Sequence, residues 1–316
     1  MPPAQVILTP DEVLQRGLQL VGFNDKRQAS VRRKKNRSRF RTHYVSEPNV
    51  YAVLLVRLQT TAIAEARINF DTVGVKKTID YFFAAIHLLA CYPREEQAEA
   101  IFGWSDRTWS NWAWKIVKNI SRLKSEIIVW PSWWGDTDSD LNDETIFIIT
   151  VDGAHFRIEE PTHENFSENT IYYSHKFKQA ALDYEVAVSI YTNDIVWAAG
   201  PYPAGVNDIT IFRKHLKGKI AESRQASGIN HRAIGDKGYR GERAFLSVPS
   251  SHDTDEVRDF KGRAMSRQEV VNARMKNFDC LLERCRHSIP KHKQCFDAVL
   301  VITQLQMENG SPLWKV

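Results

Sequence analysis

A six-residue apolar run at positions 146 to 151 constrains the fold of this chain more than any other feature. The run reads Ile-Phe-Ile-Ile-Thr-Val, it is rich in β-branched residues, and it ends on Asp152. A run of this length and composition is typical of a strand that is covered on both faces of a sheet. The sequence therefore predicts a buried strand with a carboxylate at its end.

The pattern is helical before this run and mixed after it. Helices are predicted at residues 50–67, 76–91, 94–103 and 106–124. A Gly- and Asp-rich stretch near residues 135–140 predicts a loop between two domains. Beyond the run, strands are predicted at 183–192, 195–201 and 232–235, a polar loop at 248–262, and helices at 208–222, 266–287 and 293–308. This change of period predicts an all-α region at residues 49–130 and an α/β domain at 145–312.

Composition and charge predict an intracellular protein with a phosphate-bearing partner. Hydrophobic residues make up 43% and charged residues 26% of the chain, which excludes general disorder. No leader pattern is visible, and no stretch approaches the roughly 18–20 apolar residues that a membrane helix needs. Residues 1–50 and residues 257–296 each carry ten Lys or Arg against four Asp or Glu, although the net charge is only +5. Two concentrated basic regions favour DNA as the partner.

The first basic region contains a run from residue 32 to residue 41 that has no clear helical or strand period. We expect residues 1–48 to form a flexible basic arm that serves nuclear import or contacts the DNA backbone, and the sequence does not separate these roles. A solvated charge run without a role is the remaining alternative. The basic residues of the arm are Arg32, Arg33, Lys34, Lys35, Arg37, Arg39 and Arg41.

Residues 94–124 have the pattern of a helix-turn-helix. The first helix ends at Gly103, and Ser105 or Asp106 can cap the second helix. An ordinary helical hairpin explains the pattern equally well. The second helix has an apolar face formed by Trp109, Trp112, Ile116, Ile120 and Leu123. Its opposite face, which we expect to contact DNA, carries Arg107, Asn111, Lys115 and Lys118.

Two aspartates beside glycines are the candidate metal ligands. Asp152 and Asp236 each follow a predicted strand, and strand ends are where α/β sheets expose ligand sites. Hard divalent ions bind carboxylate oxygens. Glu269 is the candidate third ligand, because it shares one helix stripe with Asn272 and Lys276. The alternative for Glu269 is a surface charge that balances nearby basic residues.

Cysteine usage argues against a secreted disulfide framework, because the chain has only four cysteines. Three of them lie close in sequence to two histidines, which raises a zinc site. The spacing matches no usual zinc knuckle, so we favour free thiols. The residues of this group are Cys280, Cys285, His287, His292 and Cys295.

Five segments of the second half resemble, in the expected order, the DDE-superfamily endonucleases of PIF/Harbinger-type transposases. The segments are Val-Asp-Gly-Ala-His at 151–155, Tyr-Tyr-Ser-His-Lys at 172–176, Pro-Tyr-Pro-Ala-Gly-Val-Asn-Asp with Ile-Phe-Arg at 201–213, Gly-Asp-Lys-Gly-Tyr at 235–239, and Arg-Gln-Glu-Val-Val-Asn-Ala-Arg-Met-Lys-Asn-Phe at 267–278. The resemblance implies a ribonuclease-H-like domain, a mixed central sheet flanked by helices, after an all-α helix-turn-helix region. Gln268 stands where close relatives are expected to have His.

By this resemblance Asp152, Asp236 and Glu269 are a catalytic triad that holds two Mg²⁺ or Mn²⁺ ions, without an organic cofactor. Asp208 matches a further recurrent acid, which we expect to cap its helix or to support the ligands. His155, Lys237 and Lys276 are expected to orient phosphate, with Asn272 beside them.

The implied activity is cutting and joining of DNA in the nucleus. The resemblance also implies dependence on a Myb-like DNA-binding protein, and a homodimer is compatible with it. Two alternatives stay open. One is a domesticated, catalytically silent nuclear DNA-binding protein, and the other is a helix-turn-helix regulator whose α/β domain does not need the carboxylates.

Overall fold

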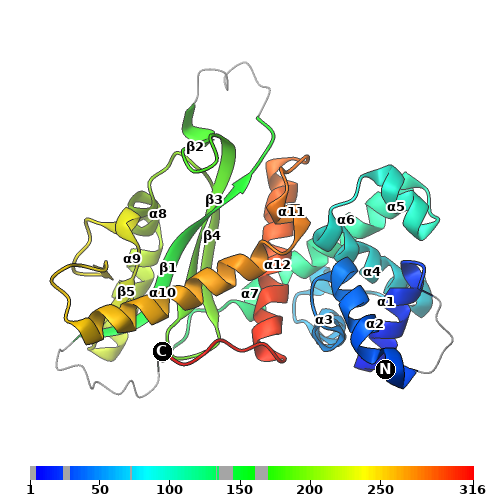
Figure 1. Cartoon of the computed structure of the whole chain (residues 1–316), viewed down its shortest axis with the longest axis horizontal. Helices are drawn as coiled ribbons and strands as arrows, with labels where there is room; N and C mark the ends of the chain where they lie inside the picture. Colours follow the sequence, from blue (N-terminus) through cyan, green and yellow to red (C-terminus); the bar gives the residue numbers. More distant parts are fainter. Residues whose placement is uncertain (1–4, 24–28, 72, 133, 135–144, 161–169) are drawn as a thin grey trace. The chain divides into compact units, whose positions relative to one another are not determined.

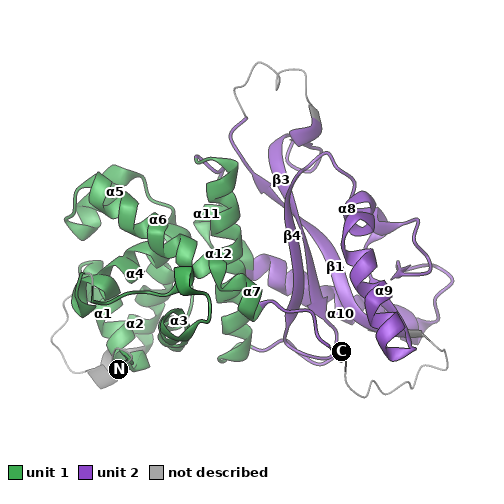
Figure 2. Ribbon diagram, turned by 180° about the vertical axis from the view of Figure 1, so that it is seen from behind, with its two compact units in different colours: residues 1–127, 275–283, 287–311 green, residues 128–274, 284–286, 312–316 purple. Residues whose placement is uncertain are grey.

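The chain forms two compact units, which Figures 1 and 2 show from opposite sides. The computed structural model describes residues 5–23, 29–71, 73–132, 134, 145–160 and 170–316. Unit 1 contains residues 1–127, 275–283 and 287–311, and unit 2 contains residues 128–274, 284–286 and 312–316. The structure thus groups the last helices with the N-terminal ones, a division different from the expected one. The loop expected near residues 135–140 lies outside the described residues.

Unit 1 is helical throughout its described part. Its elements are α1 (Pro10–Leu20), α2 (Ala29–Tyr44), α3 (Pro48–Thr60), the short η1 (Ala64–Ala66), α4 (Val75–Cys91), α5 (Glu95–Phe102), α6 (Asp106–Arg122), α7 (Lys124–Ile127), α11 (Asp279–Leu282) and α12 (Ile289–Glu308). Helix α6 packs on α4 and on α12, and these three helices supply most of the core. A search of the described residues finds no helix long and apolar enough to cross a bilayer.

The first 48 residues contain two helices, which corrects the expectation of a segment without regular period. Helix α1 begins at a capping box between Thr9 and Glu12. Helix α2 carries the basic run and is held by Phe40 and Tyr44, which are fully buried one turn apart. The Tyr44 hydroxyl donates a hydrogen bond to the carbonyl of Gly17 in α1. Two aromatic residues anchor α2 to the core but are too few to produce a visible apolar stripe.

Helices α5 and α6 form the tight hairpin that the sequence predicts. Gly103 ends α5 in the left-handed region at φ 67°, a conformation that glycine adopts without strain. Ser105 caps α6 and accepts a hydrogen bond from the backbone N–H of Thr108. Trp109 is buried as expected, but Trp112 is only half-buried and stacks on Tyr81 of α4 at 4.5 Å between ring centroids.

Unit 2 is built on a mixed sheet of six strands. The strands are β1 (Thr145–Arg157), β2 (Tyr173–Ser174), β3 (Gln179–Ser189), β4 (Ile195–Pro203), β5 (Asn230–Ile234) and β6 (Leu246–Ser247). The order is β2-β3-β1-β5-β6, and β4 also pairs with β3. Strands β1, β3 and β4 are antiparallel neighbours, whereas β5 and β6 run parallel to β1. This arrangement confirms the predicted α/β domain with a mixed sheet flanked by helices.

The position of Asp152 differs from the sequence prediction. Asp152 lies inside β1 and not at its end, because β1 continues to Arg157 through its pairing with β3. Asp236 does follow its strand directly, where it precedes the short η3 (Lys237–Tyr239) and accepts a hydrogen bond from the N–H of Gly238. The pairing with β3 thus places Asp152 in the middle of the sheet.

Helices cover both faces of the sheet, as the two opposite views show (Figures 1 and 2). On one face, Phe212 of α8 (Asp208–Lys214) and Leu216 of α9 (Leu216–Ser227) join the main core of the unit with Ile149 and Val151. On the other face lies α10 (Asp255–Met275), which begins within the segment expected to be a polar loop. Because side chains alternate along a strand, neighbouring residues of β1 face different helices.

Candidate metal centre and nucleic-acid contacts

Asp152 faces helix α10. The side-chain amide of Asn272 donates a hydrogen bond of 2.8 Å to Asp152 Oδ2. One turn earlier, the fully buried Gln268 accepts a 2.9 Å hydrogen bond from the Thr150 hydroxyl and donates to the carbonyl of Val186. These contacts fix α10 against β1 and orient the Asp152 carboxylate. Asn272, which the sequence placed beside the substrate phosphate, is therefore engaged with Asp152.

The opposite face of the two central strands carries a second set of polar side chains. In the β1–β3 ladder, Gly153 lies opposite Glu185 and His155 lies opposite Asp183. Residues directly opposite in an antiparallel pair project to the same face. Asp183 and Glu185 are both 0% exposed. Two acidic side chains thus lie in the interior of the sheet beside a glycine.

Asp208 connects this set to Asp236. A Cβ added at Gly153 would lie 2.7 Å from Asp208 Oδ1, and a Cβ added at Gly238 would clash with the same carboxylate and lie 3.0 Å from Asp236 Oδ1. The two glycines therefore make the space that the Asp208 carboxylate occupies. Asp208 is the first residue of α8 and Asn207 occupies the N-cap position, which corrects the expectation that Asp208 caps its helix.

The carboxylates of this region raise one another's pKa values. Burial raises the pKa of Asp152 to about 6, with further contributions from the charges of Asp236 and Asp208. Burial and the charges of Asp208 and Asp152 raise the pKa of Asp183 to about 7. The pKa of Asp208 rises to about 6 through burial and the charge of Asp236. Glu185, buried beside Asp183, reaches a pKa of about 8. The site holds more negative charge than its burial tolerates without compensation.

The donor set fits a divalent cation. Within the described part of the chain, neither oxygen of Asp183 has a hydrogen bond of normal geometry, although buried carboxylates are almost always satisfied. Ligand atoms of His155, Asp183 and Asp208 lie within 4.8 Å of one another. His155 is oriented for this role, because its Nδ1 lies 3.0 Å from the Ser174 hydroxyl and its Nε2 lies 3.8 Å from Asp183 Oδ1. A bound cation would neutralise the shared charge and complete the coordination of these oxygens.

Glu269 differs from Asp152 and Asp208, which are half-buried. Its side chain is exposed on α10, one turn before Asn272. Among the described residues, no hydrogen bond or ion pair joins Glu269 to Asp152, Asp208 or Asp236. The structure thus brings Asp152, Asp208 and Asp236 into one electrostatic cluster, and it places Glu269 on α10, the helix that faces Asp152, without a direct contact to the three aspartates.

Three residues near the cluster were missed by the sequence interpretation. Asp183 and Glu185 stand two positions apart in a predicted strand, and this spacing was the available signal that they share one face. Lys176 is exposed, and its positive charge opposes the rise in the pKa values of Asp152, Asp183 and Asp208. Lys176 stands in one of the segments that carry the family resemblance, but only the fold shows which carboxylates it acts on.

The other predicted phosphate contacts have varied surroundings. Lys237 is exposed directly after Asp236, which suits a contact with a ligand at the cluster. Lys276 is half-buried, just beyond the end of α10. Lys176 and Lys237 are thus both exposed near the acidic residues. The charge of Lys176 acts on the aspartates, and Lys237 follows Asp236 directly in the sequence.

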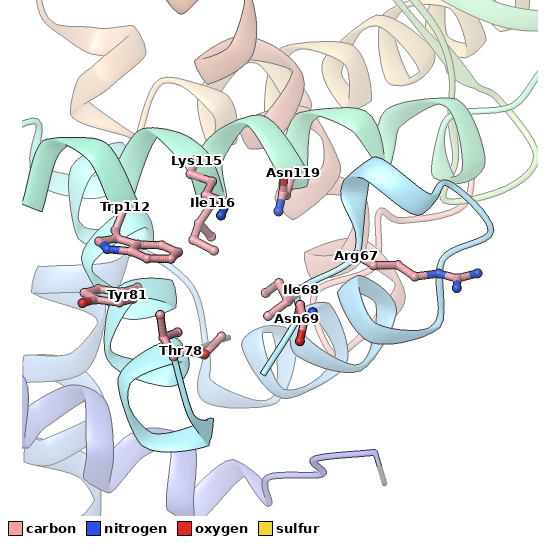
Figure 3. Close-up of a pocket in the computed structure, with 10 residues that line it drawn as sticks. Arg67, Ile68, Asn69, Thr78, Tyr81, Trp112, Lys115, Ile116 and Asn119 are labelled. Atoms are coloured by element: carbon pink, nitrogen blue, oxygen red, sulfur yellow. The ribbon is translucent and has the colours of Figure 1, made fainter. Parts of the chain in front are cut away.

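The predicted DNA-binding face of α6 is exposed. All four of its members, Arg107, Asn111, Lys115 and Lys118, point to solvent at helical spacing. Lys115 also lies over the ring of Trp112 at 4.6 Å. Figure 3 shows Lys115 and Trp112 at a pocket. Arg67 and, from α4, Tyr81 also line this pocket. A cation beside a half-buried aromatic ring is a combination that also occurs in contacts with nucleic acids.

The basic residues of α2 are partly engaged within unit 1. Arg41 forms an ion pair of 2.9 Å with Glu47, and Arg39 lies 4.7 Å from the centre of the Phe23 ring. Lys34, Lys35 and Arg37 are exposed. The side chains of Arg32 and Arg33 lie outside the described part of the structure.

The C-terminal group of cysteines and histidines does not form a metal cluster in the described residues. Cys285 belongs to unit 2, whereas Cys280, His287, His292 and Cys295 belong to unit 1. None of the five is a member of the two groups of potential metal ligands that the described residues contain. All four cysteines of the chain are outside disulfides.

Comparison with known proteins gives one match. Residues 151–304, just under half of the chain, match the family described as DDE superfamily endonuclease. No curated protein matches the chain, and no solved structure matches it. The matched segment contains the acidic cluster, Glu269 and both glycines that flank Asp208.

Proposed function

We propose, from the match of residues 151–304 to the DDE superfamily endonucleases, that the chain is a metal-dependent DNA endonuclease and strand transferase of the PIF/Harbinger type. The observation that carries this proposal is the group formed by Asp152, Asp183 and Asp208. These three aspartates are buried or half-buried, and burial and neighbouring carboxylates raise their pKa values. The strand order, three antiparallel strands continued by two parallel ones, supports a ribonuclease-H-like fold for this domain. Fold alone would not establish the activity, so the argument rests on the site.

The proposed ligands are Asp152, Asp236 and Glu269, with Asp208 as a further candidate. Mg²⁺ or Mn²⁺ bound there would supply Lewis-acid stabilisation of a phosphodiester and a water nucleophile at neutral pH. Asn272 holds the Asp152 carboxylate through its 2.8 Å hydrogen bond and so limits its rotation. Glu269 would reach the ligands by turning toward Asp152 from the same face of α10.

The basic side chains of the chain would bind the DNA. Lys176 and Lys237 are exposed near the carboxylates and would contact the phosphates that flank the cut. The exposed face of α6 and the exposed lysines of α2 would bind the duplex farther from the site. Import through the basic run, a Myb-like partner and a homodimer remain predictions of the resemblance.

Nicking of supercoiled plasmid by the purified chain tests the proposal. We expect nicking that requires Mn²⁺ or Mg²⁺ and that Asp152→Asn and Glu269→Gln each reduce by at least about 100-fold. Glu256→Gln is the matched control, because Glu256 is exposed on the same helix near its start. Full nicking by both site variants would identify a contaminant, and DNA binding without nicking by the wild type would favour the catalytically silent alternative.

A further inference from the structure

Unit 1 contains a second group of potential metal ligands, made of His43, His87 and Cys91. His87 and Cys91 stand four residues apart in α4, so their side chains lie on one face, one turn apart. Helix α2 packs on α4 and brings His43 from its last turn to the same place. Ligand atoms of the three residues lie within 4.8 Å of one another.

His87 is the buried member of this group, and its surroundings favour a bound ligand. It is 2% exposed, and among the described residues its Nδ1 has no hydrogen-bond partner. An unsatisfied buried polar atom is unfavourable. The His43 and His87 rings are nearly parallel, at 20° and 5.7 Å between centroids, so the two imidazoles lie next to each other. Burial lowers the pKa of His87 to about 4, which keeps the imidazole neutral and its lone pair available.

Cys91 supplies the third donor at the C-terminal end of α4. Its Sγ lies 3.5 Å from the carbonyl oxygen of His43 and 3.6 Å from that of Thr42, both in the last turn of α2. Burial raises the pKa of the Cys91 thiol, and the charge of Asp279 in α11 adds to this rise.

We propose that His43, His87 and Cys91 form a zinc site that fastens the basic helix α2 to α4. Zn²⁺ prefers nitrogen and sulfur donors in tetrahedral geometry, whereas Mg²⁺ and Mn²⁺ prefer oxygen. Bonds of about 2.0–2.3 Å require donor atoms about 3.5 Å apart, so the three side chains need to close by only about one ångström. A water would complete the tetrahedron. On binding, the Cys91 thiol releases its proton to solvent as the zinc–sulfur bond forms.

Cobalt binding to the metal-stripped full chain tests this site and separates it from the acidic cluster. Co²⁺ bound to a thiolate gives a sulfur-to-metal charge-transfer band that carboxylate ligands do not give. We expect this band to saturate at one Co²⁺ per chain and to disappear on addition of Zn²⁺. Asp152→Asn should keep the band, so failure of the proposed nuclease function would leave this result unchanged.

Cys91→Ser should abolish the charge-transfer band. Serine keeps a donor for the carbonyls of Thr42 and His43, so the variant is expected to fold, which circular dichroism would check. Cys295→Ser is the matched control, because Cys295 is a buried cysteine of the same unit outside the cluster. His43→Gln, at a half-buried position, should weaken Co²⁺ binding at least about tenfold. A folded wild type without the band, or a band that persists in Cys91→Ser, would overturn the proposal.

Discussion

The two units each gather potential metal ligands, and the two groups have opposite chemistry. Unit 2 collects Asp152, Asp183 and Asp208, whose pKa values are raised by burial and by the charges of neighbouring carboxylates. Unit 1 collects two imidazoles and a thiol, and burial lowers the pKa of His87 and raises the pKa of the half-buried Cys91, which favours the uncharged form of each. The carboxylates of unit 2 suit a hard cation such as Mg²⁺, which also binds phosphate oxygens. The imidazoles and thiol of unit 1 suit Zn²⁺ in a structural role.

The two groups of ligands differ in how much they destabilise the folded chain when no metal is bound. Carboxylates in a buried cluster repel one another and bind protons in place of a cation. Neutral imidazoles and a thiol cost only the hydrogen bonds they lack. The acidic cluster should therefore respond strongly to small changes in geometry and pH, whereas the cluster of unit 1 should respond to loss of a donor atom.

The largest effect should follow from filling the space beside Asp208. Gly153→Ala places a methyl group 2.7 Å from Asp208 Oδ1 and 3.2 Å from Asp183 Oδ1, so at least one carboxylate must move. We expect metal-dependent nicking to fall by at least about 100-fold, because displaced ligands lose transition-state stabilisation worth several kcal/mol. The plasmid assay measures this loss.

Gly218→Ala is the control for this substitution, because a Cβ there meets no atom within 4 Å and helix α9 tolerates alanine. The cobalt–thiolate band of unit 1 should stay unchanged in both variants. Normal nicking by Gly153→Ala would show that the Asp208 carboxylate is not needed where the structure places it.

The next effect is on the stability of the metal-free chain. The folded pKa values of Asp152, Asp183 and Asp208 are raised, so their contribution to stability is full below about pH 4 and is lost as pH rises through 6 and 7. Glu185 extends the loss to about pH 8. We expect the free energy of unfolding in EDTA to fall by at least about 3 kcal/mol between pH 4 and pH 8, because the rise in the pKa of Asp152 alone, from 3.8 to about 6, corresponds to about that much.

Urea titrations at several pH values measure this loss. Excess Mg²⁺ should reduce the slope, because the cation replaces the protons. Asp183→Asn should flatten the profile in EDTA. If the free energy of unfolding of the metal-free wild type stays constant or rises between pH 4 and pH 8, the pKa values of these carboxylates are not raised in the folded chain.

The sequence predicted the parts of unit 2 that follow from local pattern. Asp152, Asp208 and Asp236 stand out in the sequence, and the structure places them in one electrostatic cluster. Asp183 and Glu185 were missed, because charged residues in a strand are normally expected on an exposed face. Their burial depends on the packing of α8 and on the pairing of β3 with β1, which places Gly153 opposite Glu185, and these are tertiary features.

Unit 1 was predicted less completely. The helices with regular apolar spacing were found, but α1 and α2 were not, although Thr9 and Glu12 form the recognisable signal of a capping box. The spacing of His87 and Cys91 was visible within a predicted helix. The third donor, His43, lies far away in the sequence, and only the packing of α2 on α4 brings it close. The exposure of Glu269 likewise depends on how α10 meets the sheet.

A smaller effect should follow from removing the hydroxyl that orients His155. Ser174→Ala deletes the 3.0 Å contact with Nδ1 of the imidazole and leaves every carboxylate in place. Loss of a group that supports a metal ligand costs about 10–100-fold in metal affinity or activity, so the Mn²⁺ concentration for half-maximal nicking should rise by that factor. Ser125→Ala, at an exposed serine of unit 1, should not change it. An unchanged Mn²⁺ requirement in Ser174→Ala would exclude His155 as a ligand.

The smallest effect concerns Lys176, whose charge acts on all three aspartates from an exposed position. If its ammonium contacts a DNA phosphate, Lys176→Gln should lower DNA affinity a few-fold and reduce the slope of log affinity against log salt by about 1. Lys219→Gln is the control, because Lys219 pairs with Glu222 on the surface of α9. Fluorescence anisotropy in EDTA measures both variants without cleavage. An unchanged salt slope with weaker Mn²⁺-dependent nicking would assign Lys176 to the carboxylates alone, and the charge of the acidic cluster would then be balanced from within unit 2.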